Sequence, residues 1–416
     1  MLHDEIVDRA NEYLLHKTSF LATKDHLSRD EMLGFLDGLI TEICHERKLD
    51  LGPRERQPLI QMLARTVIGI GPLRPLMQDE SVTEIMVNGP DQVFVERHGK
   101  MVLSDVKFQT ESHLLAAVQR LLVDSNCNKR LDTCSPYVDF CLPDGSRVNA
   151  VVPPCSAIGP VVTIRKFRKD ITEVDDLLAL GMLDERIAAL LIAAMRGRLN
   201  VVFCGATGSG KTTALNVFSR HIPDHERIIT IEDTPELQLR QEHVVTLTSK
   251  PANIEGKGTV TIRELFVNAL RMRPERIILG EIRGAEMFDL IQAIATGHSG
   301  ALAIVHASSP RDCFDRMATL VLLSGIGLSL EQIERHVARA IDLIVHVELF
   351  PDGKRRVAHV ATVHPQTQGV HTIFEYVPHG DEAGTWRLDP APPPFLHKLE
   401  RRRVTLPQGL FAAVTP

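Results

Sequence analysis

The chain has 416 residues, 44% of them hydrophobic and 24% charged, a balance typical of a folded protein of two or three domains. Its formal net charge of −6 gives no global basic signature for nucleic acid. The longest strictly apolar run, residues 187–195, is too short to span a bilayer, and residues 1–10 lack the basic-then-apolar order of a signal peptide. We therefore expect a cytoplasmic protein, and the absence of any C-x-x-C pair argues against a zinc site.

Residues 1–68 are predicted to form a helical segment. Two apolar stripes recur in it at helical spacing, the first made of Leu33, Leu36, Ile40 and Ile43 and the second of Leu59, Met62, Leu63 and Val67. A Gly-Pro pair at residues 52–53 separates the two stripes. Such stripes are more often packing surfaces than binding sites, and we expect packing surfaces here.

Residues 69–174 are predicted to form a small α+β domain. Strand-like runs at residues 83–87 and 92–96 flank an Asn-Gly-Pro-Asp turn, which predicts a β-hairpin. Thr110 is a predicted N-cap for a helix that ends near residue 124, and further strands are expected at 137–142, 147–152 and 161–167. Arg147 and Arg165 lie in or at the edge of two of these strands, where an arginine is usually a solvated charge.

Residues 175–416 are predicted to form the main α/β domain. Residues 173–183 resemble a connector, and a helix is expected from Asp184 to Arg196, with Gly197 as its C-cap. Farther on, helical patterns run from residue 310 to about residue 343. Strands at residues 343–349 and 356–363 are expected to be joined by a Pro-Asp-Gly turn.

The segment G-A-T-G-S-G-K-T at residues 205–212 has the form of a phosphate-binding loop. An apolar run, residues 199–204, precedes it and a helical pattern follows, which is the context that the motif requires. The backbone N–H groups and the helix dipole suit a polyphosphate. The predicted nucleotide-binding residues are those of this segment and the residue after it: Gly205, Ala206, Thr207, Gly208, Ser209, Gly210, Lys211, Thr212 and Thr213.

Two side chains of the loop carry its predicted chemistry. Lys211 is expected to reach the β and γ phosphates, and Thr212 to offer its hydroxyl to Mg²⁺. A glycine-rich turn that binds nothing is the alternative, but the Lys-Thr pair would have no packing purpose there. The loop leaves the reaction open, because kinases, GTPases, helicases and motor ATPases share it.

Three further apolar runs, residues 228–231, 277–279 and 301–305, are predicted strands of the same sheet. Ionisable residues adjoin each of them: Glu232, Asp233 and Glu236 follow the first, Glu281 the second, and His298 and His306 flank the third. In an open parallel sheet, ligands bind beyond the carboxyl ends of the strands. The sequence therefore predicts one site from these separate motifs.

Each group has a predicted role and an ordinary alternative. Glu281 fits a Walker B acid beside the Mg²⁺ shell. The carboxylates after the first strand can polarise or deprotonate a water for attack on the γ phosphate, although Asp233 or Thr234 could be only a helix N-cap. The two histidines fit polar sensors near the phosphates, and core histidines are the alternative.

The set G-A-T-G-S-G-K-T-T, I-E-D-T-P-E-L, I-I-L-G-E-I-R-G and A-T-G-H-S-G-A-L-A-I-V-H-A-S-S occurs in this order. It resembles the Walker A, Asp box, Walker B and His box of the secretion ATPases of type II and type IV systems. Within that superfamily, V-T-E-I-M-V-N-G-P-D-Q-V-F-V-E-R at residues 82–97 and L-P-D-G-S-R-V-N-A at residues 142–150 resemble the CpaF branch, the motor of tight-adherence (Tad) pili. The resemblance runs from about residue 69 to the C-terminus.

The resemblance implies a hexameric ring of two-domain subunits, each with a RecA-like P-loop NTPase domain built on a mostly parallel sheet. ATP with Mg²⁺ would be held between that domain and the smaller α+β domain. Glu236 matches the general base, Glu281 the Walker B acid, and His298 and His306 the ends of the His box. Arg147 and Arg165 match arginines that reach the nucleotide phosphates. The implied partners are inner-membrane platform proteins of a pilus or secretion apparatus, with the motor peripheral at the cytoplasmic face.

Two other functions use the same loop. A DNA-translocating or helicase-like ATPase is one, and the lack of a basic balance and of aromatic stacking runs argues against it. A scaffold ring that binds nucleotide without hydrolysis is the other. Such a ring would be expected to lack an acid at the Asp box or Walker B, whereas Glu236 and Glu281 are present.

Overall fold

The computed structural model describes residues 29–47, 51–52, 55–60, 71–97, 100–125, 129–167, 171–250, 252, 257–379 and 382–411. The chain divides into two compact units, Met1–Arg168 and Lys169–Pro416. The predicted division of the chain at residues 68 and 175 stays a prediction. No helix within the described ranges is both long and apolar enough to cross a membrane.

The first unit begins with helix α3 (Arg29–Arg47). Leu36, Ile40 and Ile43 of the first predicted stripe are buried and Leu33 is half-buried, which confirms a packing surface. Of the second stripe, Leu59 is buried in a helical stretch at residues 55–60. Its other members, Met62, Leu63 and Val67, lie outside the described residues.

A six-stranded sheet forms the centre of the first unit, and all of its neighbouring strands are antiparallel. In sheet order its strands are β3 (Lys100–Leu103), β2 (Val93–Arg97), β1 (Val82–Asn88), β6 (Val161–Arg165), β5 (Arg147–Val151) and β4 (Tyr137–Cys141). The short elements η2 (Gly71–Leu73) and α5 (Arg74–Gln78) precede the sheet, and α6 (Glu111–Asp124) packs into its core. The predicted hairpin and strands are thus confirmed.

Helix α6 begins where the sequence places it. The side chain of Thr110 accepts a hydrogen bond from the backbone N–H of His113, which satisfies one of the donors that a helix start leaves open. Leu114, Val118 and Leu121 point into the core of the sheet. An N-cap and an apolar stripe are local signals, which is why this helix could be predicted.

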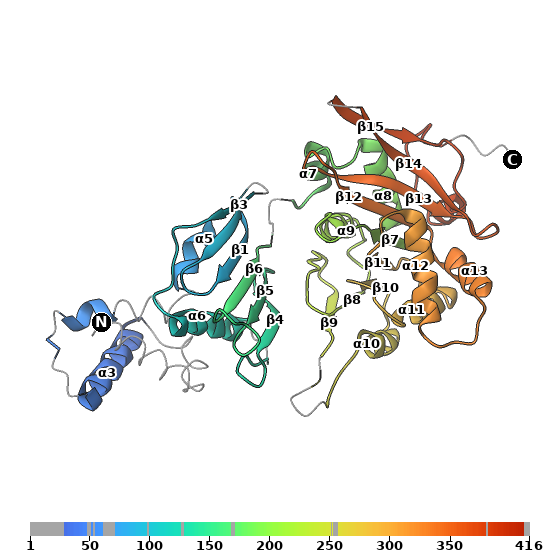
Figure 1. Cartoon of the computed structure of the whole chain (residues 1–416). Coiled ribbons are helices and arrows are strands. Elements are labelled where there is room, and N and C mark those ends of the chain that lie inside the picture. Colours follow the sequence, from blue (N-terminus) through green and yellow to red (C-terminus); the bar gives the residue numbers. More distant parts are fainter. Residues whose placement is uncertain are drawn as a thin grey trace. The chain divides into compact units, whose positions relative to one another are not determined.

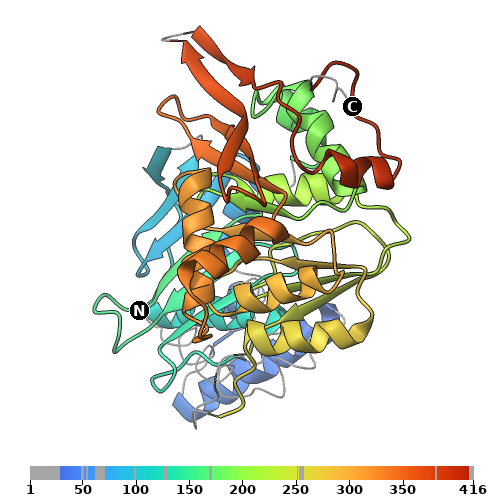
Figure 2. The ribbon, with the colours of Figure 1, turned by 90° about the vertical axis from the view of Figure 1, so that its right-hand side faces the viewer.

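The second unit is built on a nine-stranded sheet of described residues. In sheet order its strands are β15 (Glu382–Leu388), β14 (Val370–His379), β13 (Arg355–Val363), β12 (Leu343–Leu349), β7 (Val201–Cys204), β11 (Leu302–Val305), β10 (Arg276–Leu279), β8 (Ile228–Glu232) and β9 (Val244–Thr248). Strands β12 to β9 in this order are parallel, and β13 to β15 continue the sheet antiparallel. Figure 2 shows β14 and β15, in red, carrying the sheet past β13.

Helices cover both faces of this sheet. One core contains α7 (Val174–Ala179), α8 (Glu185–Arg196), α9 (Lys211–Ser219) and α14 (Leu396–Arg401), and the other contains α10 (Ile262–Ala269), α11 (Glu286–Ala295), α12 (Pro310–Leu322) and α13 (Leu330–Ala340), with η3 (Leu270–Met272) after α10. In Figure 1, α9 lies on one side of the central strands and α11 to α13 on the other. Because both faces are covered, β7, β10 and β11 are buried along their whole length. The predicted α/β class with a mostly parallel sheet is confirmed.

One prediction in this unit is wrong. Residues 173–183, predicted to be a connector, contain α7, whose capping box joins Glu173 and Asp176 through reciprocal side-chain to backbone hydrogen bonds. The E-x-x-D spacing was available in the sequence. The helix is only six residues long, however, and shows too little periodicity to be recognised by its apolar stripe.

Candidate functional site

The G-A-T-G-S-G-K-T segment joins β7, in the middle of the parallel strands, to α9, as its context predicts. Gly208 and Gly210 have φ of +75° and +101°, a region that favours glycine. At Gly205, a Cβ would lie 2.1 Å from the carbonyl oxygen of Val347 on β12. The first glycine therefore allows close packing against β12, and the later two allow the curl of the loop.

Lys211 lies inside this curl. Its side chain is buried, with 6% exposure, and Nζ donates a hydrogen bond of 2.7 Å to the carbonyl oxygen of Ala206. The backbone N–H of Ser209 points to the same oxygen, at 3.3 Å. A positive charge and an N–H group thus lie together within the loop, which is the arrangement that binds a polyphosphate.

Glu236 lies beside the start of α9. Thr212 Oγ1 donates to Glu236 Oε2 at 3.4 Å, and Asn216 Nδ2 donates to the Glu236 carbonyl oxygen at 3.2 Å. The backbone N–H of Gln238 donates in turn to Asn216 Oδ1 at 3.0 Å. Asn216 therefore fixes the segment after β8 against the helix of the phosphate loop, a role that no motif in the sequence indicates.

Glu232 has a different position from Glu236. Its side chain is 2% exposed, and Oε1 accepts hydrogen bonds from the backbone N–H groups of Glu236 and Leu237, at 2.8 and 3.0 Å. A Cβ at Gly280 would lie 2.6 Å from Glu232 Cγ, so the glycine before Glu281 leaves room for this carboxylate. Glu232 positions the turn that carries Glu236, whereas Glu236 itself is half-buried.

Glu281 and His306 meet beyond the ends of β10 and β11. His306 Nε2 lies 3.2 Å from Glu281 Oε1, and an Arg283 amino group donates to Glu281 Oε2 at 2.6 Å. Burial raises the pKa of Glu281, but the hydrogen bond from Arg283 and the charges of Arg283, His306 and Lys211 outweigh it and lower that pKa. Glu281 is therefore an ionised carboxylate at neutral pH, as a Mg²⁺ site requires.

His306 itself is held neutral. Burial and the charges of Lys211 and Arg283 lower its pKa, although Glu281 acts in the opposite direction. The structure thus brings Lys211, Glu281 and His306 to one end of the sheet. Arg283 lies with them through its hydrogen bond to Glu281. Its position two residues after that acid is the sequence signal that could have identified it as a site residue.

His298 lies at the other end of β11. Its backbone N–H donates to the Ala293 carbonyl at 3.0 Å and that of Gly297 to Ile294 at 3.1 Å, a Schellman motif that closes α11. Gly297, with φ +107°, takes the left-handed position of this motif. The polar T-G-H-S-G stretch is therefore a helix end, and the structure does not bring His298 to the phosphate loop of the same chain.

Arg147 and Arg165 lie in the first unit. They face each other across β5 and β6 in the register of that antiparallel pair, and both are exposed. The register brings two arginines to adjacent positions, and Glu84 of β1 stands opposite Arg165 on its other side and offsets part of the positive charge. A pair of arginines suits an anion with several oxygens.

A parallel sheet with a glycine-rich loop, a buried lysine inside the loop and an ionised acid after a neighbouring strand defines a P-loop nucleotide-binding protein. The family model described as "Type II/IV secretion system protein" matches residues 68–381, and the chain belongs to this family. The family is one of ATPases.

Individual relatives support the same family. A Mycobacterium tuberculosis (strain H37Rv) protein is named as a candidate conjugal transfer protein. It is 36% identical to this chain over 319 residues, which are 75% of this chain and 90% of that protein. The type IV secretion system protein VirB11 of Brucella suis biovar 1 is 34% identical over 306 residues, 66% of this chain and 83% of VirB11. Among solved structures, the pilus retraction motor PilT with bound ADP has the same fold, with a TM-score of 0.52 and 18% identity over 71% of this chain and 83% of PilT.

Proposed function

We propose that this protein is a hexameric motor ATPase that hydrolyses ATP to drive the assembly of a Tad-type pilus or a related secretion process. The observation that carries the proposal is the grouping of Lys211, Glu281 and His306 at one end of the sheet, with Glu236 at the start of the phosphate-loop helix. The motifs at residues 82–97 and 142–150 support the Tad branch by their resemblance. The motor would work in the cytoplasm on inner-membrane platform proteins.

The phosphate loop would bind ATP through its backbone N–H groups and Lys211. Thr212 and Glu281 offer oxygen ligands that fit Mg²⁺. Thr212 has a hydroxyl at the helix start, and Glu281 has a carboxylate with a lowered pKa. When bound, Mg²⁺ would neutralise charge that develops on the phosphates. His306 would report on the phosphate through its contact with Glu281.

Glu236 is the proposed general base. It lies 3.4 Å from the hydroxyl of Thr212, and the buried Glu232 holds the turn that carries it. A carboxylate so placed can take a proton from a water that attacks the γ phosphate. Glu232, whose Oε1 accepts two backbone N–H groups, has the positioning role.

Arg147 and Arg165 are proposed to bind the phosphates, as the resemblance implies. We expect Arg147→Ala and Arg165→Ala to fold, because both side chains are exposed, and to lose about a hundredfold in hydrolysis rate, because charge on the transferring phosphoryl group is no longer stabilised. Phosphate release by the purified variants measures this. Unchanged rates would return both residues to solvated charges.

The proposed function is tested by ATP hydrolysis of the purified chain with and without Mg²⁺, and with single-stranded DNA added. We expect Mg²⁺-dependent turnover that DNA does not change. Stimulation by DNA would favour a translocase instead. Binding of ATP with no turnover would favour a scaffold ring. Deletion of the gene should abolish pili if the Tad assignment is correct, and unchanged pili would contradict it.

A further inference from the structure

Arg355 contacts the phosphate loop from a distant part of the chain. It is the first residue of β13, and its Nε donates a hydrogen bond of 2.8 Å to the carbonyl oxygen of Gly208. Its Cδ lies 3.3 Å from the position that a Cβ on Gly210 would take. A cationic side chain thus lies along the outside of the loop, in a place that no sequence motif indicates.

This hydrogen bond fixes the orientation of one peptide group. The carbonyl of Gly208 and the N–H of Ser209 belong to the same planar trans peptide and point in opposite directions. The Ser209 N–H is directed into the loop, toward the Ala206 oxygen that Lys211 also contacts. By holding the Gly208 carbonyl outward, Arg355 keeps the Ser209 N–H inward. Gly208, at φ +75°, offers little resistance of its own to a peptide flip.

The hairpin that carries Arg355 is firmly held. The buried guanidinium of Arg356 makes two hydrogen bonds to Asp352, at 3.0 and 2.6 Å, and lies 5.2 Å from the ring centre of Phe350 and 4.9 Å from that of Tyr376. Val347, on the other strand of the hairpin, packs against Gly205. The backbone of Arg355 therefore has a fixed position relative to the loop, so its side chain can hold the loop in one conformation.

We propose that Arg355 is a positioning residue for nucleotide binding. Its hydrogen bond to Gly208 keeps the loop in the conformation in which the N–H groups face the phosphates, and it thereby sets the affinity for nucleotide without contacting the phosphates. The inference rests on the proposed function, because it concerns the same loop. It adds that the β12–β13 hairpin is part of the nucleotide site.

Two substitutions of similar length separate the hydrogen bond from the charge. In Arg355→Gln, the amide nitrogen stands at the same distance along the side chain as Nε of arginine and remains a donor. In Arg355→Met, the length is kept and the donor is lost. Titration of the full chain with a fluorescent ATP analogue should give a dissociation constant about tenfold higher for Arg355→Met and within about twofold of wild type for Arg355→Gln.

The neighbouring exposed residue Lys354 supplies the control, because its backbone hydrogen bonds lie within the turn, with Phe350 and Asp352, and Lys354→Met removes a charge from that turn. This variant should bind like wild type. The KM for ATP of Arg355→Met should rise with its affinity loss, while kcat at saturation stays within about twofold, since the loop closes correctly once nucleotide is bound.

Two results would overturn the inference. Wild-type affinity in Arg355→Met would show that the hydrogen bond from Arg355 to Gly208 is not needed for nucleotide binding. Weak binding by Arg355→Gln together with restored binding by Arg355→Lys would show that charge acts directly on the phosphates. Failure of the wild-type chain to bind any nucleotide would instead refute the proposed function, so the two failures are distinguishable.

Discussion

Charged side chains differ in burial and pairing between the two ends of the parallel strands in the second unit. At the carboxyl ends, Glu236, Glu281 and His306 are half-buried on loops, and Lys211 is directed at a backbone carbonyl. At the amino ends, the ion pair between Arg276 and Glu226 is buried, and the partly exposed Arg198 and Lys398 pair with buried carboxylates. The half-buried groups available to a ligand thus lie at the carboxyl ends, beside the buried Glu232 that holds the turn of Glu236, and the buried pair of Arg276 and Glu226 lies at the amino ends.

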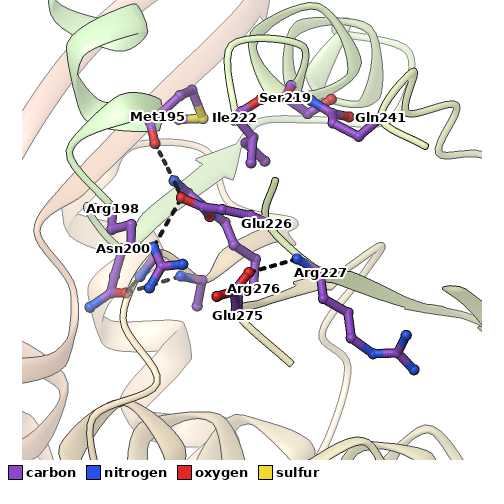
Figure 3. Close-up of polar contacts among 12 residues, drawn as sticks. Met195, Arg198, Asn200, Ser219, Ile222, Glu226, Arg227, Gln241, Glu275 and Arg276 are labelled. Atoms are coloured by element: carbon purple, nitrogen blue, oxygen red, sulfur yellow. Dashed lines mark hydrogen bonds and ion pairs between the residues drawn. The ribbon is translucent and has the colours of Figure 1, made fainter. Parts of the chain in front are cut away.

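The amino end is organised around Arg276, the first residue of β10, whose side chain is 0% exposed. Its Nε donates to Glu226 at 2.5 Å and an amino group donates to the Met195 carbonyl at 2.5 Å, while Arg198 donates to the same glutamate at 3.1 Å (Figure 3). The contacts tie the end of α8 to the first residue of β10 and to the segment before β8. A buried pair of this kind costs desolvation and is strongly destabilising to break.

Asn200 extends this arrangement to the central strands. Its Oδ1 accepts from the backbone N–H groups of Gly300 and Ala301, and its Nδ2 donates to the Ala340 carbonyl at 2.7 Å. Its own N–H donates to the buried Asp342 at 2.9 Å. One side chain therefore aligns the starts of β7, β11 and β12, and so fixes where their other ends deliver the site residues.

The largest effect is expected at the carboxyl end, from Lys211→Ala. Hydrolysis should fall at least a hundredfold, roughly to background, because the charge that stabilises the transferring phosphoryl group is gone. Thermal unfolding should change little, since the Lys211 contact is with the loop itself. Phosphate release measures the hydrolysis rate, and calorimetry measures thermal unfolding. Turnover near that of wild type would contradict the role assigned to Lys211.

Glu236→Gln should keep nucleotide binding and lose about a hundredfold in rate, because an amide cannot accept the proton of the attacking water. The matched control is Asp233→Asn, whose side chain contacts Ser249. Single-turnover hydrolysis with bound ATP measures the step directly. A normal rate would move the base to Glu232 or Glu281.

At the amino end, Arg276→Met should affect stability and spare chemistry. Removing the guanidinium takes the fully buried partner from Glu226 and leaves it the ion pair with the less buried Arg198, which should cost about 3 kcal/mol of unfolding free energy. Adding Glu226→Gln should recover part of that loss. Urea unfolding measures the stability and nucleotide titration the site. A folded Arg276→Met chain with reduced affinity would show that the two ends are not independent.

The smallest effect concerns His346, a buried residue of β12 beside Cys204, the residue before the phosphate loop. Burial and His359 lower its pKa to about 4. The unfolded chain therefore binds more protons than the folded chain between that value and about 6.5, so stability is lost as the pH falls through this window. The full contribution is on the order of 3 kcal/mol.

His346→Gln should flatten the pH dependence of urea unfolding between pH 4 and 6.5. His359 faces it across the strand pair and its pKa is also lowered by burial, so a residual slope should remain. An unchanged slope would show that His346 does not titrate with unfolding.

Much of the chemistry was predictable because it is local. The phosphate loop, the acid after β10 and the caps of α6 and α8 are formed by neighbouring residues, and consecutive residues carry their signal in the sequence itself. The apolar runs of β7, β8, β10 and β11 were predicted for the same reason. Strands β9, β14 and β15 and helices α10 and α11 were not among the predicted elements.

The sequence by itself determined that a P-loop site exists and which acids and histidines adjoin its strands. Only the tertiary structure decided that Glu232 turns inward while Glu236 faces Thr212, and that His298 closes a helix at the far end of β11. It also placed Arg355 on a loop that lies 147 residues earlier. The physical reason is that strand order and register fix which side chains meet across a sheet, and these depend on packing between segments that are far apart in the chain.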